Sequence, residues 1–367
     1  MNHKFIVTGG GTSGHINPAI TIADALKKYY ADQGDTCEVI FTGRSEGLEG
    51  ELVPKAGYEL KNIVAKPFPM KPSIKMIKAL KAFRQGRKQC RQIIKEFQPD
   101  AVIGTGGYVC APLLMEASKL KVPVVIHEAN AFPGRANRMM GRKADLVLTG
   151  FPNQEKDFPK AKRVVFTGNP IREMVIGTEF ASSREKLGVP MDAKFVFAMG
   201  GSLGAKTIND FMIEAAGKPE FADVKFVLSS GKQQTKILNS GVKIPDNLTV
   251  LSYIDNPNDY MAAADVSILR AGAVTCAETA AIGACAIFIP YPYAAHDHQT
   301  YNANTFVKED GAVLVPDATV AEGELYNKLN ELLNDEIRRM QLREGAKKLA
   351  VLDCSDRIVK AIVETLK

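Results

Sequence analysis

An apolar strand followed by a glycine-rich turn and a helix occurs once in each half of the chain. The first copy is KFIVTGGGTSGHINPA from Lys4, and the second is FVFAMGGSLGAKTIND from Phe195. Further apolar runs alternate with helical stretches after each copy, a pattern typical of parallel sheets covered on both faces. The repetition predicts an α/β protein with two Rossmann-like, doubly wound parallel-sheet domains that face a cleft.

The break between the two domains is predicted near residue 165. Residues 1–165 form the first domain and residues 166–349 the second. The helical stretch about 350–367 follows no strand of its own and is expected to pack back on the first domain. In the first half, strands are predicted at 4–8, 37–42, 101–104, 122–127 and 145–149; those assigned to the second half begin with 164–167, 194–199 and 224–229.

The composition is that of an ordinary globular protein, with 46% hydrophobic and 24% charged residues. No apolar run approaches the roughly 20 residues that a membrane-spanning helix requires. The six cysteines include no C-x-x-C pair, which argues against a zinc site or a redox dithiol. Scattered cysteines of this kind are typical of the reducing cytosol.

Positive charge is concentrated in the first half of the chain. Residues 1–165 hold 26 Lys and Arg against 15 Asp and Glu, a net charge of +11, and residues 60–95 contain eleven basic side chains and no acid. The helix predicted over 73–97 adds an apolar side, with Ile74, Ile77 and Leu80. This predicts a partner that is an anionic membrane surface. A solvated basic face over ordinary core contacts is the alternative; nucleic acid is not favoured, because few aromatic residues interleave.

The first glycine-rich turn is shaped for phosphate but completes neither common cofactor motif. Its glycines allow backbone N–H groups to approach an anion at a helix start. The second strand ends with Arg44 instead of the acid that would hold a NAD ribose, and the P-loop lysine is replaced by His15. On the first turn of a helix, whose dipole disfavours the imidazolium, His15 is a candidate general base. The alternative is that it only caps or packs the loop.

Two further stretches of the second half can bind a nucleotide diphosphate. In LRAGAVTCAETAAIG a strand ends at Arg270 and a helix begins near Val274, so its N–H groups can hold phosphate. Glu278, about one turn further on, can accept hydrogen bonds from ribose hydroxyls. Arg172 in TGNPIR offers a bidentate fork to a diphosphate, and Ser202 in GGSLGA a hydroxyl.

Polar residues also follow two other strands. Glu128 and Asn130 lie in HEANAFPGRANR, at the carboxyl edge where α/β proteins bind ligands. Glu128 is a second candidate base; the alternatives are an electrostatic partner or a structural residue. Asn130 suits sugar hydroxyls, as does Gln299. The triplet 296–298, His-Asp-His, has no further ligand cluster, so a metal site is not predicted.

These segments together resemble the MurG family of N-acetylglucosamine transferases. The matching pieces occur in order over about residues 8–304: TGGGTSGHINPA, GTGGYV, HEANAFPGRANR, TGNPIR, GGSLGA, RAGAVTCAETAAIG and DHQTYNA. The resemblance implies a GT-B fold and an inverting transfer of GlcNAc from UDP-GlcNAc to the muramoyl C4 hydroxyl of lipid I, giving lipid II. It implies an enzyme of peptidoglycan synthesis, and so of cell shape and division, at the cytoplasmic face of the cell membrane, without cofactor or metal.

The resemblance also implies roles for individual positions. His15 or Glu128 would be the base, and the acceptor junction would be lined by Thr12, Ser13 and Gly14. Asn130 and Gln299 would contact the GlcNAc, while Arg172 and Ser202 would bind the diphosphate. The uracil would meet Ile254. The nucleotide phosphate and ribose would be held by Ala273, Val274, Thr275, Cys276, Ala277 and Glu278.

Other functions remain open from the residues alone. Another GT-B glycosyltransferase acting on a glycolipid would fit the basic helix equally well. An NADP-dependent oxidoreductase would place Arg44 on the 2′-phosphate, and a membrane-associated nucleotide-sugar sensor would bind UDP-GlcNAc without transfer.

Overall fold

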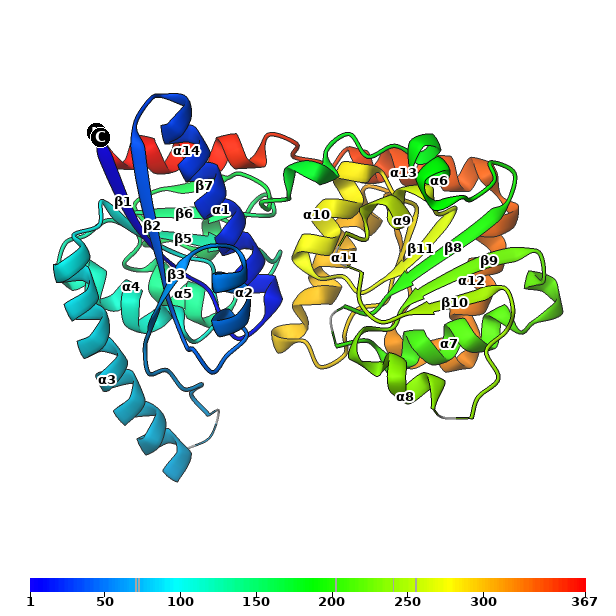
Figure 1. The fold of residues 1–367 in the computed structure, drawn as a ribbon, viewed down its shortest axis with the longest axis horizontal. Helices are drawn as coiled ribbons and strands as arrows, with labels where there is room; N and C mark the ends of the chain where they lie inside the picture. Colours follow the sequence, from blue (N-terminus) through cyan, green and yellow to red (C-terminus); the bar gives the residue numbers. More distant parts are fainter. Residues whose placement is uncertain (70, 72, 202, 240, 255) are drawn as a thin grey trace. The chain divides into compact units, whose positions relative to one another are not determined.

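The chain forms two units, each built around its own parallel sheet (Figure 1). A computed structural model describes residues 1–69, 71, 73–201, 203–239, 241–254 and 256–367. The first unit comprises Met1–Ile171 and Asp353–Lys367, and the second Arg172–Leu352. The first unit thus continues six residues past the break expected at 165. Two doubly wound Rossmann-like sheets confirm the predicted fold class.

The sheet of the first unit has seven parallel strands in the order β3-β2-β1-β4-β5-β6-β7. Assigning strand 164–167 to the second half was wrong: it is β7, and Val164 pairs with Val147 of β6. The strands are β1 (Asn2–Thr8), β2 (Thr36–Gly43), β3 (Glu59–Asn62), β4 (Ala101–Gly104), β5 (Val124–Glu128), β6 (Leu146–Thr149) and β7 (Val164–Phe166).

Helices cover both faces of this sheet, because alternate strand residues point to opposite sides. In β1, Phe5 and Val7 join a core with α1, whereas Ile6 joins the core on the other face with α3 and α4. The helices of the unit are α1 (Ser13–Asp32), α2 (Glu49–Lys55), α3 (Ile74–Phe97), α4 (Cys110–Lys119), α5 (Arg135–Gly141) and α14 (Cys354–Leu366).

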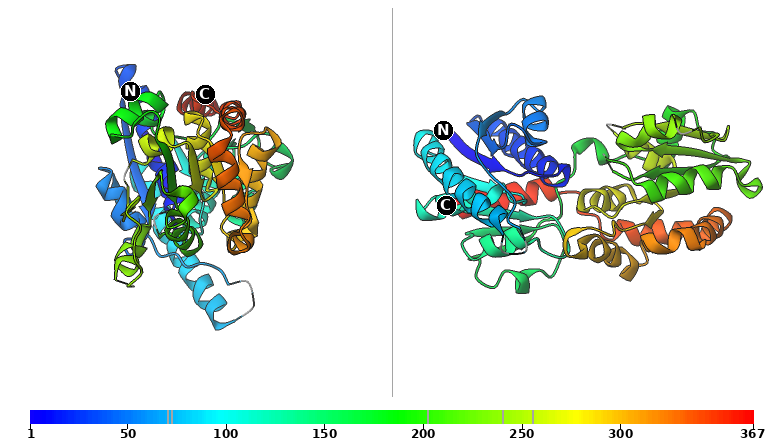
Figure 2. Two further views of the ribbon diagram at one scale, coloured as in Figure 1. Left: turned by 90° about the vertical axis from the view of Figure 1, so that its right-hand side faces the viewer. Right: turned by 90° about the horizontal axis from the view of Figure 1, so that it is seen from below.

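The last helix of the chain belongs to the first unit. Ile358 and Ile362 of α14 are fully buried in the same core as Ile22 and Leu26 of α1, beside which α14 runs (Figures 1 and 2). The preceding helix, α13 (Glu336–Lys347), packs within the second unit against α10.

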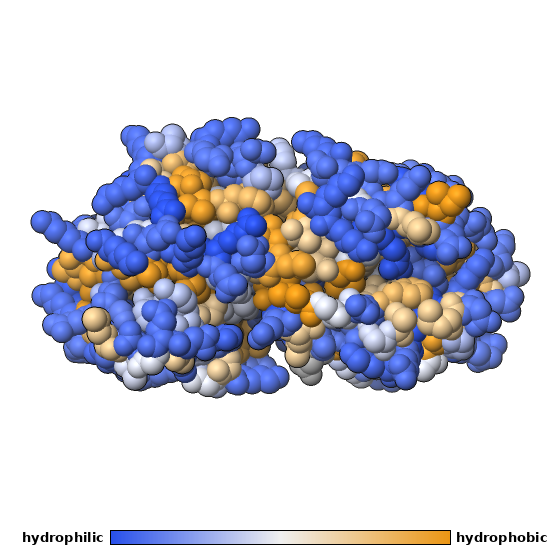
Figure 3. All heavy atoms as spheres, turned by 90° about the horizontal axis from the view of Figure 1, so that it is seen from above, coloured by the Kyte–Doolittle hydropathy of each residue, from blue (hydrophilic) through white to orange (hydrophobic). Residues whose placement is uncertain are grey.

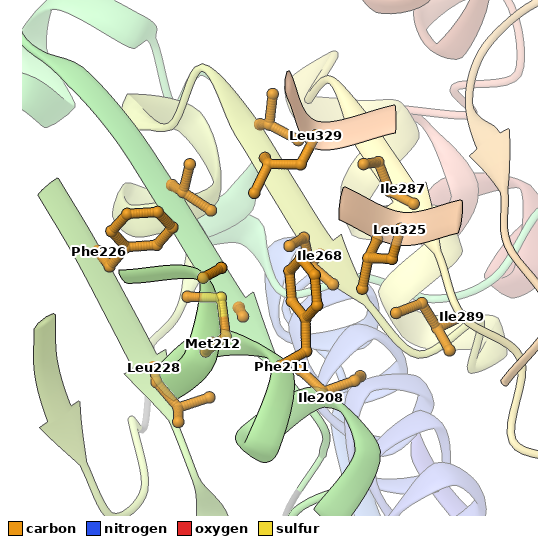
Figure 4. Close-up of a cluster of buried hydrophobic side chains, with 14 of the residues drawn as sticks. Ile208, Phe211, Met212, Phe226, Leu228, Ile268, Ile287, Ile289, Leu325 and Leu329 are labelled. Atoms are coloured by element: carbon orange, nitrogen blue, oxygen red, sulfur yellow. The ribbon is translucent and has the colours of Figure 1, made fainter. Parts of the chain in front are cut away.

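The second unit has six parallel strands in the order β10-β9-β8-β11-β12-β13. Its main core joins the sheet to α7 and α12, with Phe211, Phe226 and Leu329 among the buried side chains (Figure 4). The strands are β8 (Lys194–Met199), β9 (Val224–Ser229), β10 (Leu248–Leu251), β11 (Val266–Leu269), β12 (Ala286–Phe288) and β13 (Val313–Leu314).

Seven α-helices besides α13 accompany this sheet in the described part of the second unit. They are α6 (Phe180–Leu187), α7 (Lys206–Ala216), α8 (Gln234–Leu238), α9 (Asn258–Ala263), α10 (Ala273–Ile282), α11 (His298–Lys308) and α12 (Glu324–Asn334).

Hydrophilic side chains cover much of the face shown in Figure 3, and apolar side chains form patches among them. Among the residues that the structure describes, no helix combines the length and the apolar character needed to cross a membrane.

Candidate functional site

The strand order of each sheet reverses at one point, and in open α/β sheets the crevice that binds ligands forms there. In the first unit the chain runs from β1 outward to β2 and β3, then returns to add β4 on the other side of β1. Open α/β sheets bind ligands outside the carboxyl ends of the two strands at such a point. The loops that meet here are the glycine-rich turn after Thr8 and the GTGG turn after β4.

Close backbone approach explains the glycines of these two loops. Gly10 N donates to Gly106 O at 3.3 Å, and Thr105 Oγ1 donates to the carbonyl of His15 at 2.7 Å. A Cβ at Gly9 would lie only 2.1 Å from Thr105 Oγ1. Gly106 has a φ of +120°, and a Cβ there would lie 2.7 Å from Nδ1 of His15. The glycines therefore let the imidazole of His15 lie against the GTGG turn.

The predicted acceptor residues share the amino end of α1. Thr12 is the N-cap, with extended backbone, and Ser13 begins the helix. Thr12 and Gly14 are exposed, whereas His15 is half-buried. The N–H groups of a first helical turn have no intrahelical partner, so this end favours an anionic ligand. The structure thus brings Thr12, Ser13, Gly14 and His15 together.

Glu128, the other candidate base, accepts hydrogen bonds from the loop that follows it. It ends β5 with 1% of its surface exposed. Oε1 accepts Asn130 N at 2.9 Å and Asn130 Nδ2 at 3.3 Å, while Oε2 accepts Gly134 N at 2.9 Å and Asn137 Nδ2 at 3.0 Å. Burial raises the pKa of this carboxyl, and the hydrogen bonds oppose the shift. Glu128 therefore fixes the backbone around Asn130.

His127, next to Glu128, is a neutral structural histidine. It is fully buried, and Nε2 lies 3.4 Å from the carbonyl oxygen of Gly168. Burial lowers its pKa to about 4, the Gly168 carbonyl opposes the shift, and the nearby His15 adds to it. An imidazole that stays uncharged at neutral pH and lies in the core is not a candidate for proton transfer with solvent or substrate.

Two residues not assigned a role from the sequence lie beside the first glycine-rich turn. Glu49 is buried and accepts the backbone N–H of Gly11 at 3.4 Å. Tyr108 lies against Gly11, and its hydroxyl accepts a hydrogen bond from Arg44 Nη1 at 2.7 Å. The motif GTGGYV contains Tyr108 and points to it, whereas Glu49 lies in a polar stretch with no signal of its own.

The second unit repeats the crevice between β8 and β11. The glycine-rich turn 200–205 follows β8, and Gly272 precedes α10 as an extended N-cap. Ser202, expected at the diphosphate, lies outside the described residues. The predicted nucleotide segment Ala273, Val274, Thr275, Cys276, Ala277 and Glu278 forms the first half of α10, so its first-turn N–H groups are available to phosphate.

Glu278 and Arg172 form the charged part of this crevice. Arg172 Nη2 lies 3.9 Å from Glu278 Oε1, with 44% of the arginine side chain but only 8% of the glutamate side chain exposed. Burial raises the pKa of Glu278 to about 7, and Arg172 lowers it in part. The protein therefore replaces only part of the water contacts that this carboxylate loses on burial.

A half-buried ion pair braces the loops of this crevice. Arg270 Nη1 lies 2.6 Å from Asp317 Oδ1 and donates to the carbonyls of Ile289 and Pro290 at 3.0 Å each. Thr207 of α7 donates to Asp317 Oδ2 at 3.1 Å. The loops after β11 and β12 and the start of α7 are thus tied together, a role that the strand-end position of Arg270 did not reveal.

The remaining predicted contacts lie near this edge of the sheet. Gln299, in the first turn of α11, accepts the N–H of Tyr291 through Oε1 at 2.9 Å and so closes the loop after β12. Ile254 is half-buried between β10 and α9. Among the described residues, no group of three or more His, Cys, Asp or Glu side chains could hold a metal ion.

Comparison with known proteins assigns each half of the chain to a domain of one family. Residues 5–149 match the glycosyltransferase family 28 N-terminal domain, and residues 195–358 match the corresponding C-terminal domain. The chain is 38% identical to the UDP-N-acetylglucosamine–N-acetylmuramyl-(pentapeptide) pyrophosphoryl-undecaprenol N-acetylglucosamine transferase of Acetivibrio thermocellus, covering 99% of this chain and 98% of that protein. The transferase of the same name from Caldanaerobacter subterraneus is also 38% identical, over 98% and 99% of the two chains.

Solved structures show the same architecture. The crystal structure of Acinetobacter baumannii MurG matches with a TM-score of 0.75 and 28% identity, covering 99% of this chain and 100% of that one. Staphylococcus aureus MnaA in complex with UDP has a TM-score of 0.70 at 17% identity, which is a likeness of fold alone.

Proposed function

The chain belongs to the MurG family of UDP-N-acetylglucosamine–N-acetylmuramyl-(pentapeptide) pyrophosphoryl-undecaprenol N-acetylglucosamine transferases, and we propose how its two units divide that reaction. It is a GT-B glycosyltransferase that transfers GlcNAc from UDP-GlcNAc to lipid I, giving lipid II of peptidoglycan synthesis. In our proposal the second unit binds UDP-GlcNAc and the first binds lipid I. The observation that carries this division is the buried carboxylate of Glu278 beside Arg172 and the amino end of α10.

The second unit offers complementary groups to each part of UDP. The first-turn N–H groups of α10 and the guanidinium of Arg172 suit the diphosphate. The ionised Glu278 accepts two ribose hydroxyl hydrogen bonds, which replace the hydration lost on burial. Ile254 packs on the uracil, and Gln299 and Asn130 contact the sugar.

The first unit binds the acceptor and provides the general base. His15 removes the proton from the muramoyl C4 hydroxyl as its oxygen attacks the anomeric carbon of GlcNAc. The bond between that carbon and the UDP oxygen breaks on the opposite face, so the configuration inverts. Glu128 acts as a positioning residue, because both of its oxygens are engaged by N–H groups of its own loop. Arg172 and the helix N–H groups stabilise the charge that develops on the departing diphosphate.

The amino-terminal half of α3 binds the surface of an anionic membrane. It extends away from the rest of the first unit (Figures 1 and 2). Ile74 and Ile77 are 74% and 70% exposed, and Leu80 is 42% exposed. Basic side chains surround them, so apolar insertion and attraction to anionic headgroups act together. Phe68 and Pro69 precede this helix in the chain, and Met70 and Pro72 lie outside the described residues. This surface would hold the enzyme peripherally at the leaflet that carries lipid I.

One experiment tests reaction, acceptor and metal requirement together. Purified protein is mixed with labelled UDP-GlcNAc and a lipid I analogue, with and without EDTA. We expect a β-1,4-linked disaccharide product in both samples. Transfer to another glycolipid but not to the lipid I analogue would contradict the acceptor assignment. Loss of transfer in EDTA, restored by Mg²⁺, would contradict charge stabilisation by Arg172 and helix N–H groups alone.

A further inference from the structure

Glu49 is a buried carboxylate to which the reaction just described gives no role. It is the first residue of α2, and only 1% of its surface is exposed. A buried ionised carboxylate is costly unless hydrogen bonds replace its hydration. The groups around Glu49 therefore indicate what it does.

Both oxygens of Glu49 accept backbone N–H groups from different loops. Oε2 lies 3.4 Å from Gly11 N, and Oε1 lies 3.2 Å from Arg44 N. Gly11 is in the glycine-rich turn after β1, and Arg44 follows β2. One side chain thus joins the two loops at the carboxyl edge of the sheet, next to the helix start that carries His15.

Three glycines leave the space that the Glu49 side chain occupies. A Cβ at Gly43 would lie 2.8 Å from Glu49 Cγ, and a Cβ at Gly47 or Gly10 would lie 2.7 or 3.0 Å from Glu49 Cδ. Gly43 is the last residue of β2, and Gly10 and Gly47 lie in the loops that follow β1 and β2. A larger residue at any of the three would displace the carboxylate from the N–H groups it accepts.

These contacts fix the orientation of the glycine-rich turn. Gly11, with a φ of +87°, donates its N–H to Glu49 Oε2. The ring of Tyr108 also lies against Gly11, and the Tyr108 hydroxyl accepts a hydrogen bond from Arg44. The N–H groups that remain for an anion are those at the start of α1, beside Ser13 and Gly14.

We propose that Glu49 is a positioning residue that sets the glycine-rich turn and Arg44 in the geometry that receives the diphosphate of the lipid acceptor. The proposal rests on the first unit binding lipid I. Because Glu49 acts through Gly11 and Arg44, its removal changes acceptor binding and leaves the UDP-GlcNAc crevice of the second unit intact.

The test is Glu49→Gln, with Glu51→Gln as the matched control. Glutamine has nearly the same shape but only one accepting oxygen, so one of the two N–H groups faces an NH₂ group. We expect the KM for a soluble lipid I analogue to rise about tenfold, equivalent to about 1.4 kcal/mol, with the KM for UDP-GlcNAc unchanged. Hydrogen exchange at the Gly11 amide, followed by NMR, should become faster. Glu51 is exposed on α2, and Glu51→Gln should change neither of the two KM values.

The outcomes separate this inference from the proposed function. Equal changes in both KM values, or a lower melting temperature with both KM values unchanged, would overturn the positioning role. A change confined to the KM for UDP-GlcNAc would also overturn it. Failure of the unmodified enzyme to use the lipid I analogue would instead count against the proposed function.

Discussion

Glu278→Gln should make the ligand-free protein more stable above pH 7 while weakening UDP binding. Burial raises the pKa of Glu278 to about 7 from its ordinary value of 4.5, and Arg172 at 3.9 Å compensates only in part. A difference of about 2.5 units corresponds to roughly 3 kcal/mol. The ionised carboxylate destabilises the folded second unit by this free energy.

The sign of the pH dependence follows from which state holds the proton. Between about pH 4.5 and 7 the folded protein keeps Glu278 protonated, while the unfolded chain has lost that proton. Raising the pH through this window therefore favours unfolding, and the contribution of Glu278 to the free energy of unfolding falls by roughly 3 kcal/mol. Above pH 7 it is constant. Glu278→Gln has no proton to lose, so its stability relative to the unmodified protein should rise across the same window and then level off.

The measurement is urea unfolding of the protein at pH values from 5 to 8. Hydrogen exchange of peptides from α10 reports the unfolding of the second unit, because the chain has no tryptophan to serve as a fluorescent probe. Glu214→Gln is the control, since the Glu214 side chain on α7 is 73% exposed. UDP affinity at pH 8 should fall at least tenfold in Glu278→Gln, as two hydrogen bonds to a charged acceptor are weakened. Parallel stability profiles for Glu278→Gln and the unmodified protein would refute the reasoning.

Three other variants test the remaining roles. His15→Ala should lower kcat at least 100-fold with little change in either KM, because general base catalysis typically contributes that much; near-normal turnover at saturating substrates would remove His15 from the role. In Glu128→Gln the side-chain NH₂ takes the place of one oxygen, so that either the two Asn130 donors or Gly134 N and Asn137 Nδ2 lose their acceptor. The first unit should then lose about 2 kcal/mol in thermal unfolding; an unchanged melting temperature would contradict the loop-holding role. The double change Ile74→Glu and Ile77→Glu should reduce binding to anionic vesicles at least tenfold by co-sedimentation, with normal transfer to a water-soluble acceptor; unchanged sedimentation would exclude α3 as the membrane surface.

The sequence predicts the parts of the fold that have strong periodicity. Apolar runs such as KFVFAM give β8 with its observed bounds, and the helix predicted over 73–97 is α3 within one residue. Two edge strands are not predicted, because β3 is the polar run ELKN and β13 has only two residues. Their pairing is decided by a neighbouring strand, which local sequence does not display.

Strand 164–167 was assigned to the wrong sheet for a related reason. It follows a loop and precedes the second glycine-rich unit, so its position in the chain suggests the second half. Its membership is decided by pairing with β6, a contact that depends on the completed first sheet.

Side-chain direction limits what sequence shows about the site. His15 and Glu278 are conspicuous because a strand–turn–helix motif fixes their surroundings. Glu128 looks equally suited to catalysis, yet its loop folds back and occupies the carboxylate with four hydrogen bonds. Glu49 shows the reverse, since its importance comes from contacts with Gly10 and Gly11, which are distant in sequence and meet it only in the folded unit.

The place of α14 in the first unit has a consequence for biosynthesis. Four buried side chains of α14, those of Ile358, Val359, Ala361 and Ile362, complete a core whose other buried members precede residue 172. The roughly 180 intervening residues take about 10 to 40 s to synthesise at 5–20 residues per second. Throughout that interval the nascent chain displays the bare apolar flank of α1, a target for a ribosome-associated chaperone until translation delivers the closing helix.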